Sequence, residues 1–429
     1  MTDVRKNYIN LSALFIVILI LSGRQNTFAQ LAERLFTTDY RIDSLDKGNL
    51  SVEVDNLSFF KNNEFGTTIQ KGYTLPGYWL QLKAVYYPFS NLKIEAGAHS
   101  IWFWGTTRYP AFVYKGNVPT WRGRDYANNV HVLPYFRANF ALSDNVSVII
   151  GDIYGGSNHR LIEPLYNPEL NLSSDPEAGV QLLYKNKWID LDMWIDWMTF
   201  VYELDYCQEA FVFGTSARLK LNSPDSRYHL YVPLQSMMMH EGGEIDVSGS
   251  NVETVMNSAA GVGLNWNNNG IVLKNINTEF YVAGYNYLRG GKYKFKNGRG
   301  YYAKMAVQLK DFNVSASYWE CKDFVSMYGS AFYGSVSTKI FNDPETNKEN
   351  MLYYKPKMLH FGVDYVRSLG KGFAFGVNAE AYYNLSGKLY SSETGIYEGI
   401  YDPLAFGNNA NFSFGMYLRV NPSFLIKRY

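Results

Sequence analysis

The chain has 429 residues, and its 40 lysine and arginine residues nearly balance its 39 aspartate and glutamate residues. A surface that binds nucleic acid needs an excess of basic residues, so this balance argues against nucleic acid as a partner. Aromatic residues make up 17% of the chain, and there are 36 glycines. This composition is expected of membrane β-barrels.

The N-terminus has the pattern of a secretory signal. Two basic residues precede the apolar run 11–21, and a small residue, Ala29, offers a cleavage site. The run is shorter than the roughly 20 apolar residues that a membrane-spanning helix needs. We therefore predict that residues 1–30 are a signal peptide that is removed, and that residues 31–49 are a periplasmic N-terminal lead-in.

Residues 188–197 show most clearly the pattern of the rest of the chain. The odd-numbered side chains from Ile189 to Trp197 are apolar, whereas Asp190, Asp192 and Asp196 occupy even positions. A β-strand sends successive side chains to opposite faces, so this stretch has one apolar face and one anionic face. In an outer-membrane barrel these faces point to lipid and to the lumen respectively.

Sixteen alternating segments follow one another along the chain. They are residues 51–60, 75–87, 92–104, 130–142, 146–154, 177–185, 188–197, 211–221, 227–235, 258–266, 271–285, 301–309, 312–319, 359–367, 373–384 and 411–420. Short connections alternate with mostly longer ones, as short periplasmic turns alternate with long extracellular loops in a transmembrane barrel. The sequence thus predicts an all-β fold, a transmembrane antiparallel up-and-down β-barrel of about 16 strands (14–18), with residues 50–429 as its single domain.

These features together resemble those of bacterial outer-membrane porin-like β-barrel proteins. The resemblance is one of architecture, without a family-specific motif, and it implies integration into the outer membrane of a Gram-negative cell envelope. Such barrels usually end on an aromatic residue that closes the last strand. Here residues 421–429 follow the last alternating segment, so either the last strand is displaced toward Tyr429 or a short tail follows it.

The alternation also predicts which charged side chains face the lumen. These candidate lumen charges are Lys83, Lys93, Glu95, Arg137, Asp190, Asp192, Asp196, Arg218, Lys220, Arg227, Glu279, Asp364, Glu380 and Arg419. Acids cluster on one strand and bases on the next ones, and adjacent strands lie about 5 Å apart. Two interpretations stay open, a transverse field across a water-filled pore and a salt-bridge network that fills a closed lumen.

The connection 155–175 is the third long loop. In trimeric sixteen-stranded porins the third loop folds inward as a constriction, and the resemblance raises that arrangement here. The analogy is one of position only, so we predict an ordinary surface loop. Cys207 and Cys321 are too few for a disulfide framework, and we treat them as unpaired.

No motif indicates catalysis. The six histidines are scattered, and neither a Gly-x-Ser-x-Gly sequence nor a clustered metal-ligand spacing is present. We predict no enzyme, no cofactor and no metal site. The predicted function is passive diffusion of small hydrophilic solutes.

The alternative is a non-transporting barrel subunit or scaffold of a larger outer-membrane complex. Its partners would be outer-membrane lipid and envelope proteins, or further copies of the chain. The long connections 105–129 and 322–357 would form the partner surface, because they carry aromatic residues that look exposed: Tyr109, Phe112, Tyr114, Trp121, Phe324, Tyr328, Phe332 and Tyr333. Folding of the same loops over the lumen would explain these residues without a partner.

Overall fold

A computed structural model provides the structure of the chain. It describes residues 35–67, 70–104, 131–203, 205, 207–243, 245, 247–268, 270–291, 295–335, 352–390 and 409–429. Within these ranges no helix has the length and the apolar character needed to cross a membrane. The predicted signal peptide, and the aromatic residues Tyr109, Phe112, Tyr114 and Trp121, lie outside the described residues.

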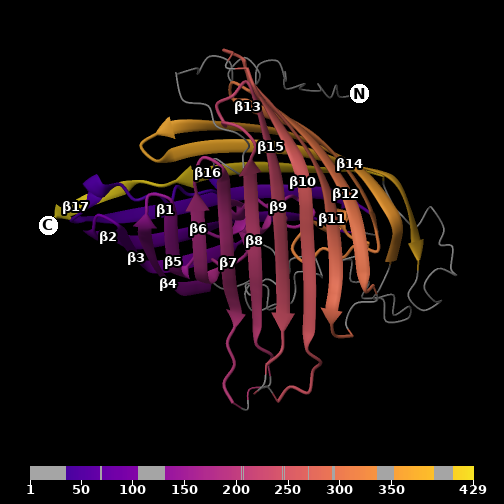
Figure 1. Ribbon diagram of the computed structural model, residues 1–429, viewed down its shortest axis with the longest axis horizontal. Coiled ribbons are helices and arrows are strands. Elements are labelled where there is room, and N and C mark those ends of the chain that lie inside the picture. The colour runs from indigo at the N-terminus through magenta and orange to yellow at the C-terminus, as the bar shows by residue number, and fades with distance from the viewer. Residues whose placement is uncertain are drawn as a thin grey trace, which may run out of the picture.

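The fold is a closed antiparallel β-barrel of sixteen strands (Figure 1). The strands are β1 (Asn49–Gly66), β2 (Lys71–Phe89), β3 (Leu92–Phe103), β4 (His131–Ser143), β5 (Val146–Asp152), β6 (Ala178–Lys185), β7 (Ile189–Thr199), β8 (Ala210–Lys220), β9 (Tyr228–Glu241), β10 (Glu253–Asn267), β11 (Leu273–Arg289), β12 (Asn297–Leu309), β13 (Phe312–Lys322), β14 (Leu352–Gly370), β15 (Phe373–Tyr390) and β16 (Ala410–Val420). Each strand pairs with the next, and β16 pairs with β1 to close the barrel. Each of the sixteen predicted segments overlaps one of these strands, so the predicted fold class and the porin-like architecture are confirmed.

Strand β16 shows how the alternation of side chains positions the chain between lipid and lumen. Phe412, Phe414, Met416 and Leu418 are exposed on the outer face, whereas the side chains between them are buried on the inner face. A barrel in a membrane needs such an apolar outer band, since a bilayer offers no hydrogen bonds to polar groups.

The last strand is interrupted and then continues. After Asn421 and Pro422 the chain forms β17 (Ser423–Arg428), which pairs with the first residues of β1. The amide of Val54 donates to the carbonyl of Pro422 at 3.1 Å, and the amide of Tyr429 donates to the carbonyl of Gly48 at 2.8 Å. The strand therefore reaches the C-terminal tyrosine in two pieces, which resolves the two alternatives for residues 421–429.

The connection between β5 and β6, residues 153–177, crosses the lumen and is called the inward loop below. It contains a 3-10 helix, η4 (Gly156–His159), and one turn of α-helix, α4 (Leu170–Ser173). Leu165 and Leu170 are buried almost completely, and Glu163 reaches Lys304 on the far wall at 2.7 Å. The prediction of an ordinary surface loop is wrong, because these apolar and charged side chains find their partners inside the barrel.

Two further segments occupy the lumen. The lead-in enters beside Arg419, whose guanidinium donates to the carbonyls of Leu35 and Thr37, and the amide of Thr38 donates to Asn158 on the inward loop at 2.9 Å. Residues 323–335, which include η5 (Ala331–Tyr333), follow β13 and meet the inward loop where Ser326 donates to the carbonyl of Pro164 at 2.5 Å.

The aromatic residues of segment 323–335 pack inside the barrel. Phe324, Phe332 and Tyr333 are at most 1% exposed, and Tyr328 is half-buried beside Tyr166 of the inward loop. The interpretation of these four residues as exposed is therefore wrong. Burying such large rings stabilises the packed lumen, at roughly 25 cal/mol for each Å² of apolar surface removed from water.

Candidate functional site

The barrel wall has a notch on the side of β5 and β6. These strands have only 7 and 8 residues, against the roughly 9–11 that a membrane-spanning strand needs. The last pair between β4 and β5 joins Arg137 and Gly151, so among the described strands β4 has no neighbour on that side over residues 131–136. Figure 1 shows β5 and β6 as short arrows beside the longer β7 to β9.

Two carboxylates, a proline and a glycine suit the edges of this notch, where strand neighbours are missing among the described residues. The carboxylate of Asp152 accepts from the amide of Phe136 at 2.6 Å, and that of Asp196 accepts from the amide of Ala178 at 2.9 Å. Pro134 has no amide hydrogen to leave unpaired, which suits a strand edge. At Gly151 the φ angle is +95° and a Cβ atom would lie 2.2 Å from the carbonyl oxygen of Phe136, so only glycine fits there. The residue types at these four positions therefore fit a gap in the strand pairing.

An apolar cavity of about 350 Å³ lies beside this notch and is called the apolar chamber. Its apolar lining includes Leu133, Leu161, Leu170, Trp194, Met198, Val212 and Met237. The ionisable and hydroxyl side chains that line it include His131, His159, Ser174, Asp175, Glu177 and Asp196. An apolar pocket with a few converging polar groups is the usual form of a site for a small or lipid-like ligand.

His131 and Asp175 form an ion pair at the edge of the chamber. His131 is the first residue of β4 and Asp175 lies at the end of the inward loop, and the imidazole Nε2 is 3.0 Å from Oδ1 and 3.1 Å from Oδ2 of the carboxylate. Both side chains are about 12% exposed. A histidine held by a carboxylate in this way is a common general base. The neighbouring hydroxyl of Ser174 donates to the carbonyl of Leu170 at 2.7 Å.

His159 fastens the inward loop to the wall. Its Nδ1 is 2.7 Å from the carboxylate of Asp192, its Nε2 is 2.9 Å from that of Glu177, and its ring stacks on Trp194 with 3.5 Å between the centroids. Burial alone would lower the pKa of His159, but the carboxylates of Glu177 and Asp192 outweigh it and raise this pKa to about 10. The imidazole is therefore charged at neutral pH.

This arrangement predicts a transition at high pH. A histidine whose folded pKa is raised stabilises the docked loop fully below its unfolded pKa of about 6.5, and the stabilisation is lost as the pH rises toward 10. Since Trp194 stacks on the ring, its fluorescence should change with a midpoint near pH 10. The change should be absent in His159→Gln and retained in His240→Gln. An identical titration in His159→Gln would contradict the assignment.

The far end of the inward loop has its own anchors. Glu163 accepts from the hydroxyl of Tyr333 at 2.6 Å and lies 3.0 Å from Nδ1 of His360. Burial would raise the pKa of Glu163, but Lys304 and His360 hold it well below its usual range. Glu169 accepts from Asn63 at 2.9 Å and from the hydroxyl of Tyr73. The loop is thus tied to opposite sides of the barrel.

The structure brings four of the candidate lumen charges into one cluster. The carboxylate of Glu95 lies 2.8 Å from Lys83, 3.3 Å from Lys93 and 3.0 Å from Arg137. The guanidinium of Arg137 also donates to the carbonyl of Ile153 at 2.9 Å, so the cluster holds the start of the inward loop.

The other candidate lumen charges are dispersed. Several of them form ion pairs on the wall: Asp190 with Lys220 at 2.6 Å, Arg218 with Glu279 at 3.8 Å, Glu380 with Lys61 at 3.1 Å, and Arg419 with Asp55 at 3.0 Å. Asp364 accepts a hydrogen bond from Asn313 at 3.4 Å. Asp192 and Asp196 have the contacts given above. Arg227 lies in an exposed turn before β9, with its guanidinium 5.7 Å from the ring of Tyr228. Most of these charges are neutralised by a partner on the wall or the inward loop.

A comparison with protein families decides the affiliation of the chain. The profile of the family described as lipid A 3'-O-deacylase-type matches residues 42–429. The chain belongs to this family. The match spans every strand of the barrel and the last residues of the lead-in. A search among curated proteins found no match.

Membership of the lipid A 3'-O-deacylase-type family corrects one prediction. The absence of a sequence motif led us to predict that the chain is no enzyme, and a family named for an enzymatic activity overturns this. A short motif requires residues that are neighbours in the sequence, whereas the ion-paired His131 and Asp175 are 44 residues apart. Among the described residues, no three histidine, cysteine or acidic side chains are arranged to hold a metal ion.

Several solved outer-membrane proteins resemble this family member in structure. OccAB2 of Acinetobacter baumannii is 11% identical, with a TM-score of 0.47 over 88% of this chain and 99% of its own. OprD of Pseudomonas aeruginosa is 9% identical, with a TM-score of 0.46 over 91% and 98%. A loop-deletion mutant of OmpT of Vibrio cholerae is 10% identical, with a TM-score of 0.46 over 87% and 99%. The fold assignment itself rests on the strand pairing described above.

Two parts of the site were missed in the sequence. His131 is one of the six scattered histidines, and nothing local in the sequence connects it with Asp175. His159, Glu163 and Glu169 belong to a loop that we placed on the surface. The combination of an unusually short hairpin with a long, partly apolar connection was the available signal, since such a loop has both the room and the reason to fold inward.

Proposed function

We propose that this outer-membrane barrel hydrolyses an acyl ester of a lipid A-type glycolipid in the apolar chamber. The observation that carries the proposal is the position of the His131–Asp175 pair, at the edge of an apolar cavity beside a notch in the lipid-facing wall. The family affiliation supports the same reaction class.

The notch gives the lipid a route. The outer surface beside it carries exposed apolar side chains, among them Val132, Phe136, Ile150 and Val180, which are 47–58% exposed. Asp152 and Asp196 occupy two of the amides at the edges of the notch, which lowers the cost for an acyl chain that passes through it from the bilayer. The apolar chamber then takes up the chain.

The proposed chemistry is general-base hydrolysis. Because Nε2–H of His131 donates to Asp175, Nδ1 is the nitrogen that accepts a proton from water. The hydroxide adds to the ester carbonyl, the carbon–oxygen bond to the alcohol breaks, and the imidazolium returns the proton to the departing alkoxide, giving a free fatty acid and an alcohol. Asp175 holds the ring and stabilises the imidazolium. Water is the proposed nucleophile, because the Ser174 hydroxyl is already donated to the carbonyl of Leu170.

Passive diffusion of small hydrophilic solutes is the second candidate. A closed barrel of sixteen strands has the circumference for an aqueous channel unless something fills it. The lead-in, the inward loop and segment 323–335 occupy this lumen, which weighs against free diffusion.

Two assays on the purified protein separate these candidates. Incubation with micelles of a long-chain ester should release fatty acid, and the same preparation in a planar bilayer should show no stable open conductance. Fatty acid release that depends on His131 supports the hydrolase. A stable conductance with no ester hydrolysis would contradict it and support passive diffusion.

A further inference from the structure

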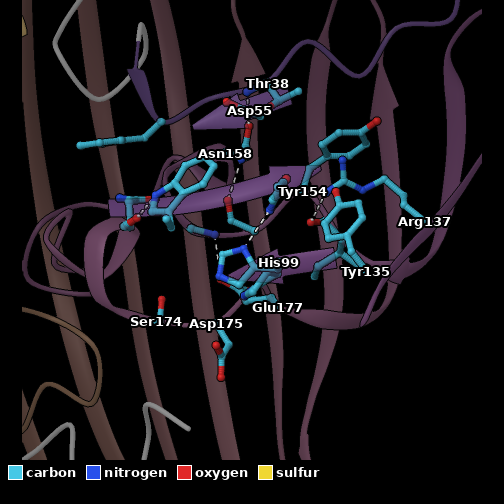
Figure 2. A pocket seen from close by; sticks show the side chains of 18 of the residues that line it. Thr38, Asp55, His99, Tyr135, Arg137, Tyr154, Asn158, Ser174, Asp175 and Glu177 are labelled. Atoms are coloured by element: carbon cyan, nitrogen blue, oxygen red, sulfur yellow. Dashed lines mark hydrogen bonds between the residues drawn. The ribbon is translucent and has the colours of Figure 1, made fainter. Parts of the chain in front are cut away.

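A second cavity, of about 120 Å³, lies on the other side of the chain segment 174–177 and is called the polar chamber. Strands β2 to β4 contribute Trp79, Lys83, His99, Tyr135 and Arg137 to its lining. Figure 2 shows His99, Tyr135 and Arg137 of this set around the chamber. Ser174, Asp175, Pro176, Glu177 and Tyr166 line both chambers. The two chambers therefore adjoin at Asp175, the partner of His131.

Two buried polar atoms in this chamber have no partner among the described residues. They are Nε2 of His99 and the hydroxyl of Tyr135, and the two side chains belong to residues that are 3% and 2% exposed. The Nδ1 of His99 accepts a hydrogen bond from the side-chain amide of Gln81, whose Nε2 lies at 3.4 Å. The ring hydrogen of His99 is therefore on its own Nε2. An unsatisfied buried donor costs about 1–3 kcal/mol, which a ligand oxygen would recover.

Each lysine and arginine that lines the chamber already contacts a carboxylate. Arg419 is paired with Asp55, and both Lys83 and Arg137 are paired with Glu95. An anion such as a phosphate would therefore have to compete with Glu95 and Asp55 for these cations. The remaining donors are a neutral imidazole and a phenol, set among the aromatic rings of Trp79, Tyr135 and Tyr154. Neutral donors beside aromatic rings suit a polyhydroxylated ring.

We propose that the polar chamber is a sugar-binding site, in which His99 Nε2–H and the Tyr135 hydroxyl donate to oxygens of the ring. The inference deepens the proposed function and rests on it in one respect. If the sugar belongs to the lipid, a sugar in the polar chamber and an acyl chain in the apolar chamber place the ester between them, beside His131 and Asp175. The same chemistry would also accept a free saccharide.

The test measures binding apart from hydrolysis. All proteins carry His131→Ala, so that lipid A stays intact, and titration calorimetry in detergent measures the affinity for purified lipid A and for free N,N'-diacetylchitobiose. Tyr135→Phe removes only the hydroxyl and should weaken sugar-dependent binding about fivefold to tenfold, as the loss of one hydrogen bond of about 1 kcal/mol implies. The double variant with His99→Phe should weaken it further.

Tyr302→Phe is the matched control, because Tyr302 is equally buried in the lumen but does not line the polar chamber. Weaker binding of both ligands in Tyr135→Phe supports a site for sugars in general, and weaker binding of lipid A alone supports a head-group site. Equal affinities for lipid A and the disaccharide in Tyr135→Phe and Tyr302→Phe would overturn the inference. Normal lipid A binding without any hydrolysis by the protein that retains His131 would defeat the proposed function and leave the sugar site standing.

Discussion

Replacement of His131 by alanine is expected to reduce the rate of ester hydrolysis about a hundredfold to ten-thousandfold, the usual contribution of a general base. Among the described residues, His131 is the one histidine of the apolar chamber that contacts Asp175, and its replacement removes the imidazole that accepts the proton from water. The rate is measured as fatty acid released from long-chain ester micelles by equal amounts of folded protein.

Two variants make this result specific. Asp175→Asn keeps the shape of the partner but removes its charge, so the rate should fall while the fold is retained. His240→Ala is the control, since His240 lies on β9 against Thr254 and lines neither chamber. Equal losses in His131→Ala and His240→Ala would show that the effect comes from the barrel and not from the proposed site.

Replacement of Glu95 by alanine is expected to lower the free energy of unfolding by about 3–5 kcal/mol, as the removal of one partner of a buried ion pair does. Glu95 is 1% exposed and is the shared partner of Lys83, Lys93 and Arg137. Its loss leaves three cations close together in the lumen wall. Urea-induced unfolding in lipid vesicles, followed by tryptophan fluorescence, measures the change.

Glu320→Ala provides the matched control for this prediction. Glu320 pairs with Lys357 at 3.2 Å, but both side chains are about a third exposed, so solvent screens the pair. Its removal should change the free energy of unfolding by less than about 1 kcal/mol. A loss in Glu95→Ala no larger than in Glu320→Ala would mean that the cluster does not stabilise the barrel.

The strands were predictable from the sequence because their signal is local. In a membrane barrel each strand must place apolar side chains toward lipid and polar ones toward the lumen, and this alternation is visible within ten residues, as in residues 188–197. The break between β16 and β17 was visible only as an ambiguity, since Pro422 interrupts the pattern and the pairing partner, β1, lies at the other end of the chain.

The site was not predictable in the same way. The inward loop is held by pairs such as Glu163 with His360, 197 residues apart, and no periodicity reports such contacts. The notch was hidden as well, because the alternation in residues 146–154 and 177–185 continues beyond the last residues that pair as strands. The alternation predicted which charged side chains face the lumen, but only the fold shows that Glu95 contacts three cations and that Asp192 contacts His159.

The proposed hydrolysis is tested most directly by the mass of lipid A. Lipid A extracted from outer membranes that contain the wild-type barrel, or the His131→Ala variant at equal abundance, is compared by mass spectrometry. The account predicts that the wild-type barrel produces lipid A lacking one ester-linked acyl chain and that the variant does not. Lipid A of unchanged mass in the presence of the folded wild-type protein would contradict it.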